Sequence, residues 1–189
     1  MGATGTVAEA VTLVRSAPPR CGRTRLVAVD GPGGAGKTTF AGRLACALGD
    51  PPVVHSDDFY LPMDGDPLRW WRSFAEGVLH PVNAGRPGRF HRYDWRSGGY
   101  AEHVVVPPAP VVIVEGVGAA WRAAAPYLSV AIWVDAPPDV RVARTNSRDG
   151  PEMAVLWRIW RVSELRHFIS DATRDRADLK VDGTAAHMA

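Results

Sequence analysis

Apolar runs and amphipathic stretches alternate along the chain, and this alternation predicts strands and helices in turn. The strongest apolar runs lie at 25–30, 111–114 and 127–137, without the every-other-residue pattern of a one-sided strand. Such runs predict strands that are buried on both faces. Weaker runs predict three more strands, at 53–58, at 104–106 on a sheet edge, and at 177–183.

Apolar residues spaced three or four apart predict helices between these strands. The expected helices cover 7–15, 37–48, about 68–79, 139–148 and 153–168. Short irregular strands are expected in the rest of 59–100. Strands that alternate with helices are typical of an α/β fold with a mostly parallel sheet. We therefore expect a three-layer αβα sandwich with helices on both faces of the sheet.

The length of 189 residues and the hydrophobic content of 46% suit a single domain with one core. We expect this domain to span 1–183, with a tail at 184–189. A concentration of aromatic residues, Arg, Gly and Pro predicts a small acceptor-binding insertion at about 59–107, although the same aromatic side chains could form its core. An Arg-bearing lid is expected at about 144–162.

Charge and composition narrow the range of partners. The formal net charge of +2 is too small to indicate nucleic-acid binding, and no apolar run reaches the length of a membrane span. The N-terminal sequence does not resemble a secretory signal, and the two cysteines form no CxxC motif. We therefore expect a cytoplasmic protein that acts on a small molecule, with no nucleic-acid or membrane partner. Whether the protein forms a homo-oligomer is left open by the sequence.

The sequence GPGGAGKT at 31–38 fits the Walker A pattern G-x-x-x-x-G-K-[ST] of phosphate-binding loops. It follows a predicted buried strand and precedes a predicted helix, which is the context that the pattern requires. Glycines let successive N–H groups approach phosphate oxygens, and the helix N-terminus adds a favourable dipole. The predicted nucleotide-binding residues are Gly31, Gly33, Gly34, Ala35, Gly36, Lys37, Thr38 and Thr39.

Lys37 is unusual because nearly all of the 22 basic residues are arginines. A lysine offers a compact charge, and we expect this one to bridge the β- and γ-phosphates of ATP. The Thr38 hydroxyl is expected to ligate Mg²⁺. The loop does not identify what receives the phosphate, because motors, GTPases and kinases share it.

Carboxylates follow three of the predicted strands, and ligands of an open parallel sheet gather at these strand ends. Asp57 or Asp58, after the second strand, is expected to accept the proton of an attacking hydroxyl. Glu115 is expected to reach the metal ion, directly or through water. Asp135 is expected to cap the helix that follows it.

In order and approximate spacing, the chain resembles the uridine kinase family of P-loop kinases through DGPGGAGKTTFA, VVHSDDFY, RYDW, VVIVEGV, DVRVARTNSRD and TRDRADLKVDG. The resemblance spans about 26–183. It implies that Asp57, the first position of D-x-F-Y, is the catalytic Asp. It further implies that Thr38, Asp57 and Glu115 surround Mg²⁺.

The same resemblance implies that Tyr60 lies by the acceptor and that Tyr93 touches the base, and we add Asp58 to this substrate-binding set. Family members that phosphorylate uridine carry a base-contacting His about five residues after the matching Tyr, where this chain has Gly98. They also place an Asp against the ribose hydroxyls, and the spacing of Asp66 does not match it. The identity of the acceptor is therefore open.

Arg141, Arg144 and Arg148 are three or four residues apart, so we expect them on one face of a helix. By the resemblance, Arg144 and Arg148 are lid arginines that would cover the γ-phosphate and exclude water. The alternative is a solvated helix face. Gly150 and Pro151 are expected to separate the two lid helices.

Together these features favour an ATP- and Mg²⁺-dependent kinase that transfers the γ-phosphoryl group to a hydroxyl of a small molecule. Its expected catalytic residues are Asp57, Lys37, Arg144 and Arg148. A nucleoside such as uridine or cytidine is the first expectation for the acceptor, with pantothenate, a phosphorylated sugar or a nicotinamide riboside-like compound as alternatives. A regulatory ATPase whose output is a conformational change is the alternative from another class.

Overall fold

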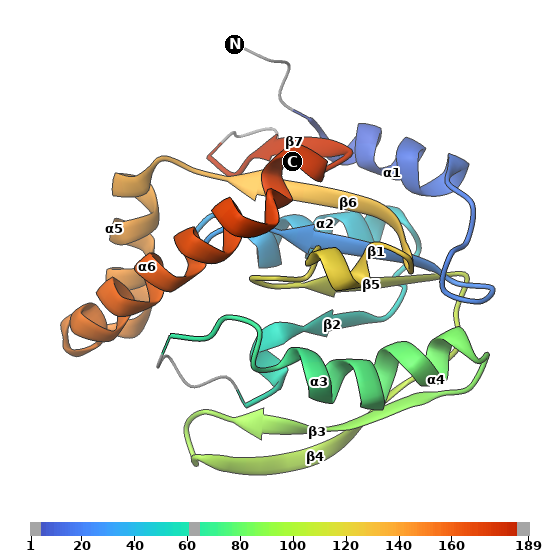
Figure 1. Cartoon of the computed structure of the whole chain (residues 1–189), viewed down its shortest axis with the longest axis horizontal. Helices are drawn as coiled ribbons and strands as arrows, with labels where there is room; N and C mark the ends of the chain where they lie inside the picture. The colour runs from blue at the N-terminus through green and yellow to red at the C-terminus, as the bar shows by residue number, and fades with distance from the viewer. Residues whose placement is uncertain (1–4, 61–64, 185–189) are drawn as a thin grey trace.

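The computed structural model describes residues 5–60 and 65–184, and its centre is a five-stranded sheet (Figure 1). The strands lie in the order β2-β5-β1-β6-β7, and every neighbouring pair is parallel. The strands are β1 Arg25–Asp30, β2 Val53–His55, β5 Val111–Glu115, β6 Leu128–Asp135 and β7 Leu179–Asp182. The predicted parallel sheet is confirmed.

Helices cover both faces of this sheet, which makes the fold the expected three-layer αβα sandwich (Figure 1). On one face lie α1 (Val7–Ser16) and α2 (Lys37–Ala47), which also contact each other. The other helices are α3 Trp71–Phe74, α4 His80–Asn83, α5 Pro138–Asp149, α6 Ala154–Asp171 and α7 Thr173–Arg176. Within residues 5–60 and 65–184, no helix is both long enough and apolar enough to cross a membrane.

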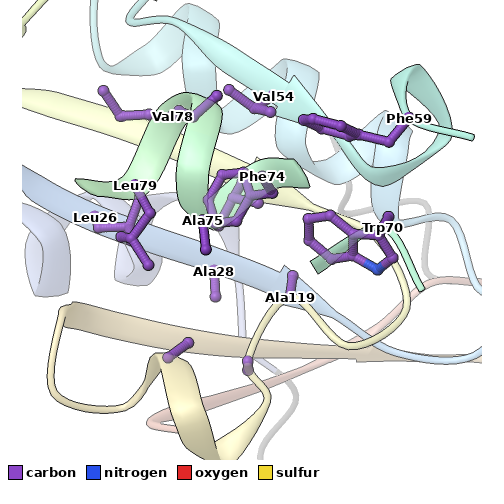
Figure 2. Close-up of a cluster of buried hydrophobic side chains, with 14 of the residues drawn as sticks. Leu26, Ala28, Val54, Phe59, Trp70, Phe74, Ala75, Val78, Leu79 and Ala119 are labelled. Carbon is purple, nitrogen blue, oxygen red and sulfur yellow. The ribbon is translucent and has the colours of Figure 1, made fainter. Parts of the chain in front are cut away.

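Two buried clusters, one on each face, explain why the central strands read as continuous apolar runs. Val27 and Val29 of β1 belong to the cluster beneath α1 and α2. Leu26 and Ala28, the alternate residues of the same strand, belong to the opposite cluster, which also contains Phe74 of α3 (Figure 2). Because successive strand residues face opposite sides, a strand between two layers must be apolar at every position.

The helix expected at about 68–79 differs from the structure at both ends. It begins at Trp71 as α3, widens into a π turn over Ala75–Leu79, and continues as α4 to Asn83. Pro81 lies inside α4, and proline has no N–H to give to a regular helical hydrogen bond. The wide turn just before Pro81 is the kind of local adjustment that lets a helix pass a proline.

Residues 104–106 form a strand as expected, but this strand does not lie at the edge of the main sheet. Those residues end β4 (Gly99–Val106), which pairs antiparallel with β3 (Gly88–Asp94) in a separate hairpin. The hairpin packs closely on the π turn. A Cβ added to Gly88 would lie only 2.9 Å from the Cα of Val78, so a larger residue than glycine would not fit there. The hairpin replaces the short irregular strands that the sequence predicted, and Figure 1 shows it beyond the α3–α4 layer.

Two predictions at strand ends are also corrected. The second strand stops at His55, and Ser56–Asp58 forms a 3₁₀ turn rather than more strand. Asp135 does not cap α5, whose N-cap is Pro137 and has no side-chain cap hydrogen bond. Its carboxylate instead accepts a hydrogen bond from the N–H of Ala136, the next residue.

Asp30, the last residue of β1, holds the start of the phosphate loop to a turn after β5. Its fully buried carboxylate accepts hydrogen bonds from the N–H groups of Gly31 at 2.7 Å, Gly118 at 3.0 Å and Ala120 at 2.8 Å. Burial raises the pKa of Asp30 to about 6, although these bonds and the charge of Lys37 act in the opposite direction. The acid therefore has a structural role beneath the loop.

The first prediction concerns the cluster of Figure 2. Phe74 is fully buried and its ring centroid lies 5.3 Å from that of Trp70. Phe74→Ala should lower the free energy of unfolding by about 3–5 kcal/mol, because it leaves a cavity at the centre of this cluster. Tyr100→Ala, at a side chain that is 68% exposed, should cost no more than about 0.5 kcal/mol. Urea unfolding measures both, and equal losses would contradict the described packing.

The second prediction follows from the raised pKa of Asp30. The folded protein holds this proton more tightly than the unfolded chain, so its contribution to stability is full below about pH 4 and is lost as the pH rises through about 6. Relative to Asp30→Asn, the wild type should lose roughly 2–3 kcal/mol of unfolding free energy over that interval. Urea unfolding of both proteins across the interval tests this. A pH dependence that is the same in the two proteins would contradict it.

Candidate functional site

The phosphate loop joins β1 to α2, and its glycines adopt backbone conformations that other residues rarely adopt. Gly31, Gly34 and Gly36 have φ angles of 145°, 78° and 101°. A Cβ at Gly31 would also collide with the carbonyl oxygen of Val134 on the neighbouring strand β6. The glycines of the Walker A pattern are therefore required by this backbone itself.

The inner side of the loop offers unsatisfied donors. Within the part of the chain that the structure describes, nothing accepts a hydrogen bond from the N–H groups of Gly36, Lys37 or Thr38. These groups stand at the N-terminus of α2, where the helix dipole also favours an anion. The ammonium group of Lys37 donates to the carbonyl oxygen of Pro32 at 3.1 Å, across the same loop. The donor set suits the phosphates of a nucleotide.

Glu115, at the carboxyl end of β5, lies against the residue that follows the loop lysine, and its expected contact with Mg²⁺ stays a prediction. Its Oε1 accepts hydrogen bonds from the Thr38 hydroxyl at 3.1 Å and from Nδ1 of His55 at 2.7 Å. Burial alone would raise the pKa of Glu115, but the His55 hydrogen bond and the charge of Lys37 hold it below its ordinary value. A buried, ionised carboxylate therefore touches the hydroxyl that the sequence assigned to Mg²⁺.

His55 was not singled out from the sequence, and the structure places it in the site, against Glu115. It ends β2 in register with Glu115 of β5, so the two side chains meet at the same sheet edge. The hydrogen bond to Glu115 raises the pKa of His55. Its position at the end of a strand that leads to D-x-F-Y was the available sequence signal.

Asp57 lies on the 3₁₀ turn after β2 and accepts a hydrogen bond from the Ser56 hydroxyl at 3.2 Å. Burial raises its pKa, the nearby carboxylate of Glu115 raises it further, and the charges of Lys37 and Arg148 lower it. The structure thus brings Asp57, Glu115 and Lys37 into one electrostatic neighbourhood.

The side-chain oxygens around Thr38 and Glu115 suit a Mg²⁺ ion that is also bound by water and phosphate, rather than a metal ion held by protein ligands alone. No group of three or more His, Cys, Asp or Glu residues that could hold a metal ion occurs in residues 5–60 and 65–184. Mg²⁺ is commonly bound by one or two carboxylates together with waters and substrate phosphates. The contact between Thr38 and Glu115 provides two suitable oxygens beside the phosphate loop.

Aromatic residues of the insertion separate into a buried set and an exposed set. Phe59, Trp70, Phe74 and Phe90 are buried in the core. Tyr60, Trp95 and Tyr100 are 45%, 49% and 68% exposed, and they gather with Tyr93 beside the hairpin. The core interpretation is therefore confirmed for the buried set, and acceptor binding by the other set stays a prediction.

The exposed aromatic set is tied to the acids after β2. Trp95 donates its indole N–H to the backbone oxygen of Asp57 at 2.7 Å. Arg92 of β3 forms ion pairs with Asp58 at 3.1 Å and with Glu102 at 2.8 Å. The ring centroids of Tyr60 and Tyr93 are 4.9 Å apart. An aromatic surface with an arginine–carboxylate pair thus borders the predicted catalytic Asp.

The two predicted lid arginines have different surroundings. Arg148 forms a two-pronged ion pair with Asp149, lies 5.6 Å from the ring centre of Trp157, and interacts electrostatically with Asp57. Arg144 donates to the carbonyl oxygens of Gly34 at 3.2 Å, of Ala35 at 3.4 Å and of Gly183 at 3.0 Å. Arg144 therefore binds the backbone of the phosphate loop. The break between the helices is confirmed, since α5 ends before Gly150.

Comparisons with known proteins agree with this architecture. No protein-family model and no curated protein matches the sequence. The structure resembles a possible uridine kinase from Bacillus stearothermophilus with a TM-score of 0.67 and 15% identity, covering 93% of this chain and 97% of that one. It resembles a candidate fructose transport system kinase from Silicibacter sp. TM1040 with a TM-score of 0.66 and 22% identity, covering 94% and 98%.

A third similar structure is the D-glycerate 3-kinase from Cryptococcus neoformans, with a TM-score of 0.54 and 15% identity, covering 85% of this chain and 84% of that chain. These three proteins carry different substrate names but share one architecture. Likeness at such low identity extends to the fold and not to the acceptor. The fold that the sequence resemblance implied is confirmed, and this chain has the α/β fold of the P-loop kinases.

Proposed function

We propose that the protein is an ATP- and Mg²⁺-dependent kinase that phosphorylates a hydroxyl group of a small molecule. The observation that carries the proposal is the convergence of Thr38, Glu115 and Asp57 beside a loop with unsatisfied N–H groups. These residues come from three segments that are far apart in sequence. Their meeting at one sheet edge supports phosphoryl transfer more strongly than the loop motif alone.

Each of these residues has a separate proposed role in phosphoryl transfer. The N–H groups at the start of α2 and the Lys37 ammonium bind and orient the nucleotide phosphates. Thr38 and Glu115 would hold Mg²⁺, which supplies charge neutralisation on the phosphates when it is bound. Arg148 adds positive charge near Asp57 and would help to stabilise the transferring group.

Asp57 is the proposed general base. As the acceptor hydroxyl attacks the γ-phosphorus, its proton passes to the Asp57 carboxylate, and ADP leaves with the bridging oxygen. Burial and the Glu115 charge raise the pKa of Asp57, which makes the carboxylate a better proton acceptor than a solvated aspartate. Asp58 is less suited to this role because Arg92 already pairs with its carboxylate.

The acceptor is proposed to be a nucleoside, as in a uridine kinase. Tyr60 and Trp95 are exposed aromatic side chains beside Asp57, and the half-buried Tyr93 contacts both of their rings. Flat bases stack on such rings. A sugar phosphate or a nicotinamide riboside-like compound would use the same surface, with Arg92 available to an anionic group. Pantothenate is the alternative without a flat ring.

A regulatory ATPase is the rival from another class. A screen of ATP consumption over nucleosides, pantothenate, sugar phosphates and nicotinamide riboside separates the two functions. The kinase proposal expects one class of acceptor to stimulate ATP consumption and to be recovered as a phosphate ester. Hydrolysis that no acceptor stimulates would support the regulatory ATPase instead.

The third prediction tests the general base. Asp57→Asn should reduce phosphoryl transfer by about 100-fold or more, because the amide cannot accept the hydroxyl proton. ATP binding should persist, since the phosphate loop is unchanged. Asp50→Asn is the matched control at an exposed aspartate after α2 and should retain wild-type turnover. Near-normal turnover in Asp57→Asn would remove Asp57 from this role.

The fourth prediction tests the aromatic surface. Tyr93→Ala should raise the KM for the acceptor about three- to tenfold through lost ring stacking, with the KM for ATP unchanged. Steady-state kinetics with each substrate varied in turn measures this split. His91→Ala, on the same strand but paired with His103, is the control. If both variants change the two KM values equally, the hairpin does not select the acceptor.

A further inference from the structure

Glu164, in the middle of α6, is a buried acid that the proposed chemistry does not use. Its side chain is only 2% exposed. Its Oε2 accepts a hydrogen bond from the N–H of Gly33 in the phosphate loop at 2.9 Å, and its Oε1 lies 3.4 Å from the guanidinium of Arg141 in α5. Fully buried glutamates are rare unless they are paired, so this pairing calls for a reason.

The bond from Glu164 to Gly33 is part of a close contact between the loop and the lid helices. A Cβ added to Gly33 would lie 2.7 Å from the ring of Trp157, which precedes Glu164 by two turns of α6. A Cβ added to Gly34 would lie 2.6 Å from the carbonyl oxygen of Arg141. The outer side of the loop thus packs directly against α5 and α6, and glycine at 33 and 34 permits the approach.

The backbone N–H and carbonyl groups on the outer side of the loop also form hydrogen bonds with side chains of α5 and α6. Glu164 accepts from the N–H of Gly33, and Arg144 donates to the carbonyl oxygens of Gly34 and Ala35. On the inner side, the N–H groups at the start of α2 have no acceptor among the described residues. The lid helices therefore bind one side of the loop and leave the other side free for phosphate.

A carboxylate close to a phosphate site would repel the ligand unless its charge were neutralised. Burial raises the pKa of Glu164, while the Gly33 N–H, the nearby Lys37 and Arg141 act in the opposite direction and stabilise its ionised form. A neutral glutamine could not replace the acid fully. If its oxygen accepted from Gly33, its amide N–H₂ would face the Arg141 guanidinium, and donor would meet donor.

We propose that Glu164 is a positioning residue that fixes the Gly33 peptide, so that the phosphate loop is preformed for ATP and mechanically joined to the lid helices. The inference rests on the proposed function, because it concerns the same loop. Glu164 itself does not touch the phosphates. It acts by holding Gly33 outward, which keeps the following N–H groups directed inward.

The test uses the whole protein and the variant Glu164→Gln, which preserves the size of the side chain. The exchange rate of the Gly33 N–H with solvent, measured by NMR without nucleotide, should rise about tenfold or more as the charge-assisted bond weakens. The dissociation constant for ATP with Mg²⁺, measured by calorimetry, should rise about tenfold. In turnover, the KM for ATP should rise far more than kcat falls.

Two further variants keep the inference falsifiable. Arg141→Met removes the partner of Glu164 but leaves the Gly33 bond, so its ATP affinity should lie between those of the wild type and Glu164→Gln. Glu152→Gln, at an exposed glutamate of the lid, should behave as the wild type. Thermal unfolding of every variant checks that each is folded.

The outcomes separate this inference from the proposed function. Unchanged Gly33 exchange in Glu164→Gln would overturn the inference, as would faster exchange with ATP affinity within twofold of the wild type, because Glu164 would then be merely structural. A wild-type protein that binds no ATP would overturn the proposed function. The Gly33 exchange rate in that same protein would still decide whether Glu164 fixes the loop.

Discussion

The structure depends on the unsatisfied N–H groups at the start of α2. A helix N-terminus leaves its first N–H groups without intrahelical partners, and an anion bound there can accept hydrogen bonds from them. Here the loop that follows β1, with its glycines at positive φ, places those groups beyond the carboxyl end of a parallel strand, where Lys37 begins α2. These free N–H donors can bind an anion, and the phosphates of a nucleoside triphosphate would accept their hydrogen bonds.

Much of the rest of the chain supports this loop. Asp30 binds its first N–H from below, Glu164 binds Gly33 from the side, and Arg144 binds the two carbonyl groups that follow. Those side chains come from β1, α6 and α5, so three elements fix a single turn. A loop that is already held in place loses less conformational entropy when a ligand binds, and this is the physical meaning of preorganisation.

The sequence predicted features that are set locally or by burial. The spacing of glycines around Lys37 identified the loop, and apolar runs identified β1, β5 and β6 because both of their faces are covered. Motifs and strand ends brought Thr38 and Glu115 together in advance, but contacts between distant residues that no such pattern marks were not predictable. Asp30 meets Ala120 across 90 positions, and Glu164 meets Gly33 across 131. The hairpin was missed although its strands are neighbours in sequence, because the pairing of 104–106 depends on tertiary packing on the π turn.

The most direct test of the account is a titration of the wild-type protein with ATP and Mg²⁺, followed by NMR at the backbone amides of Gly36, Lys37 and Thr38. We expect saturable binding that shifts these three resonances strongly, because their N–H groups gain phosphate acceptors. Absence of binding, or binding that leaves these three amides unchanged, would contradict it.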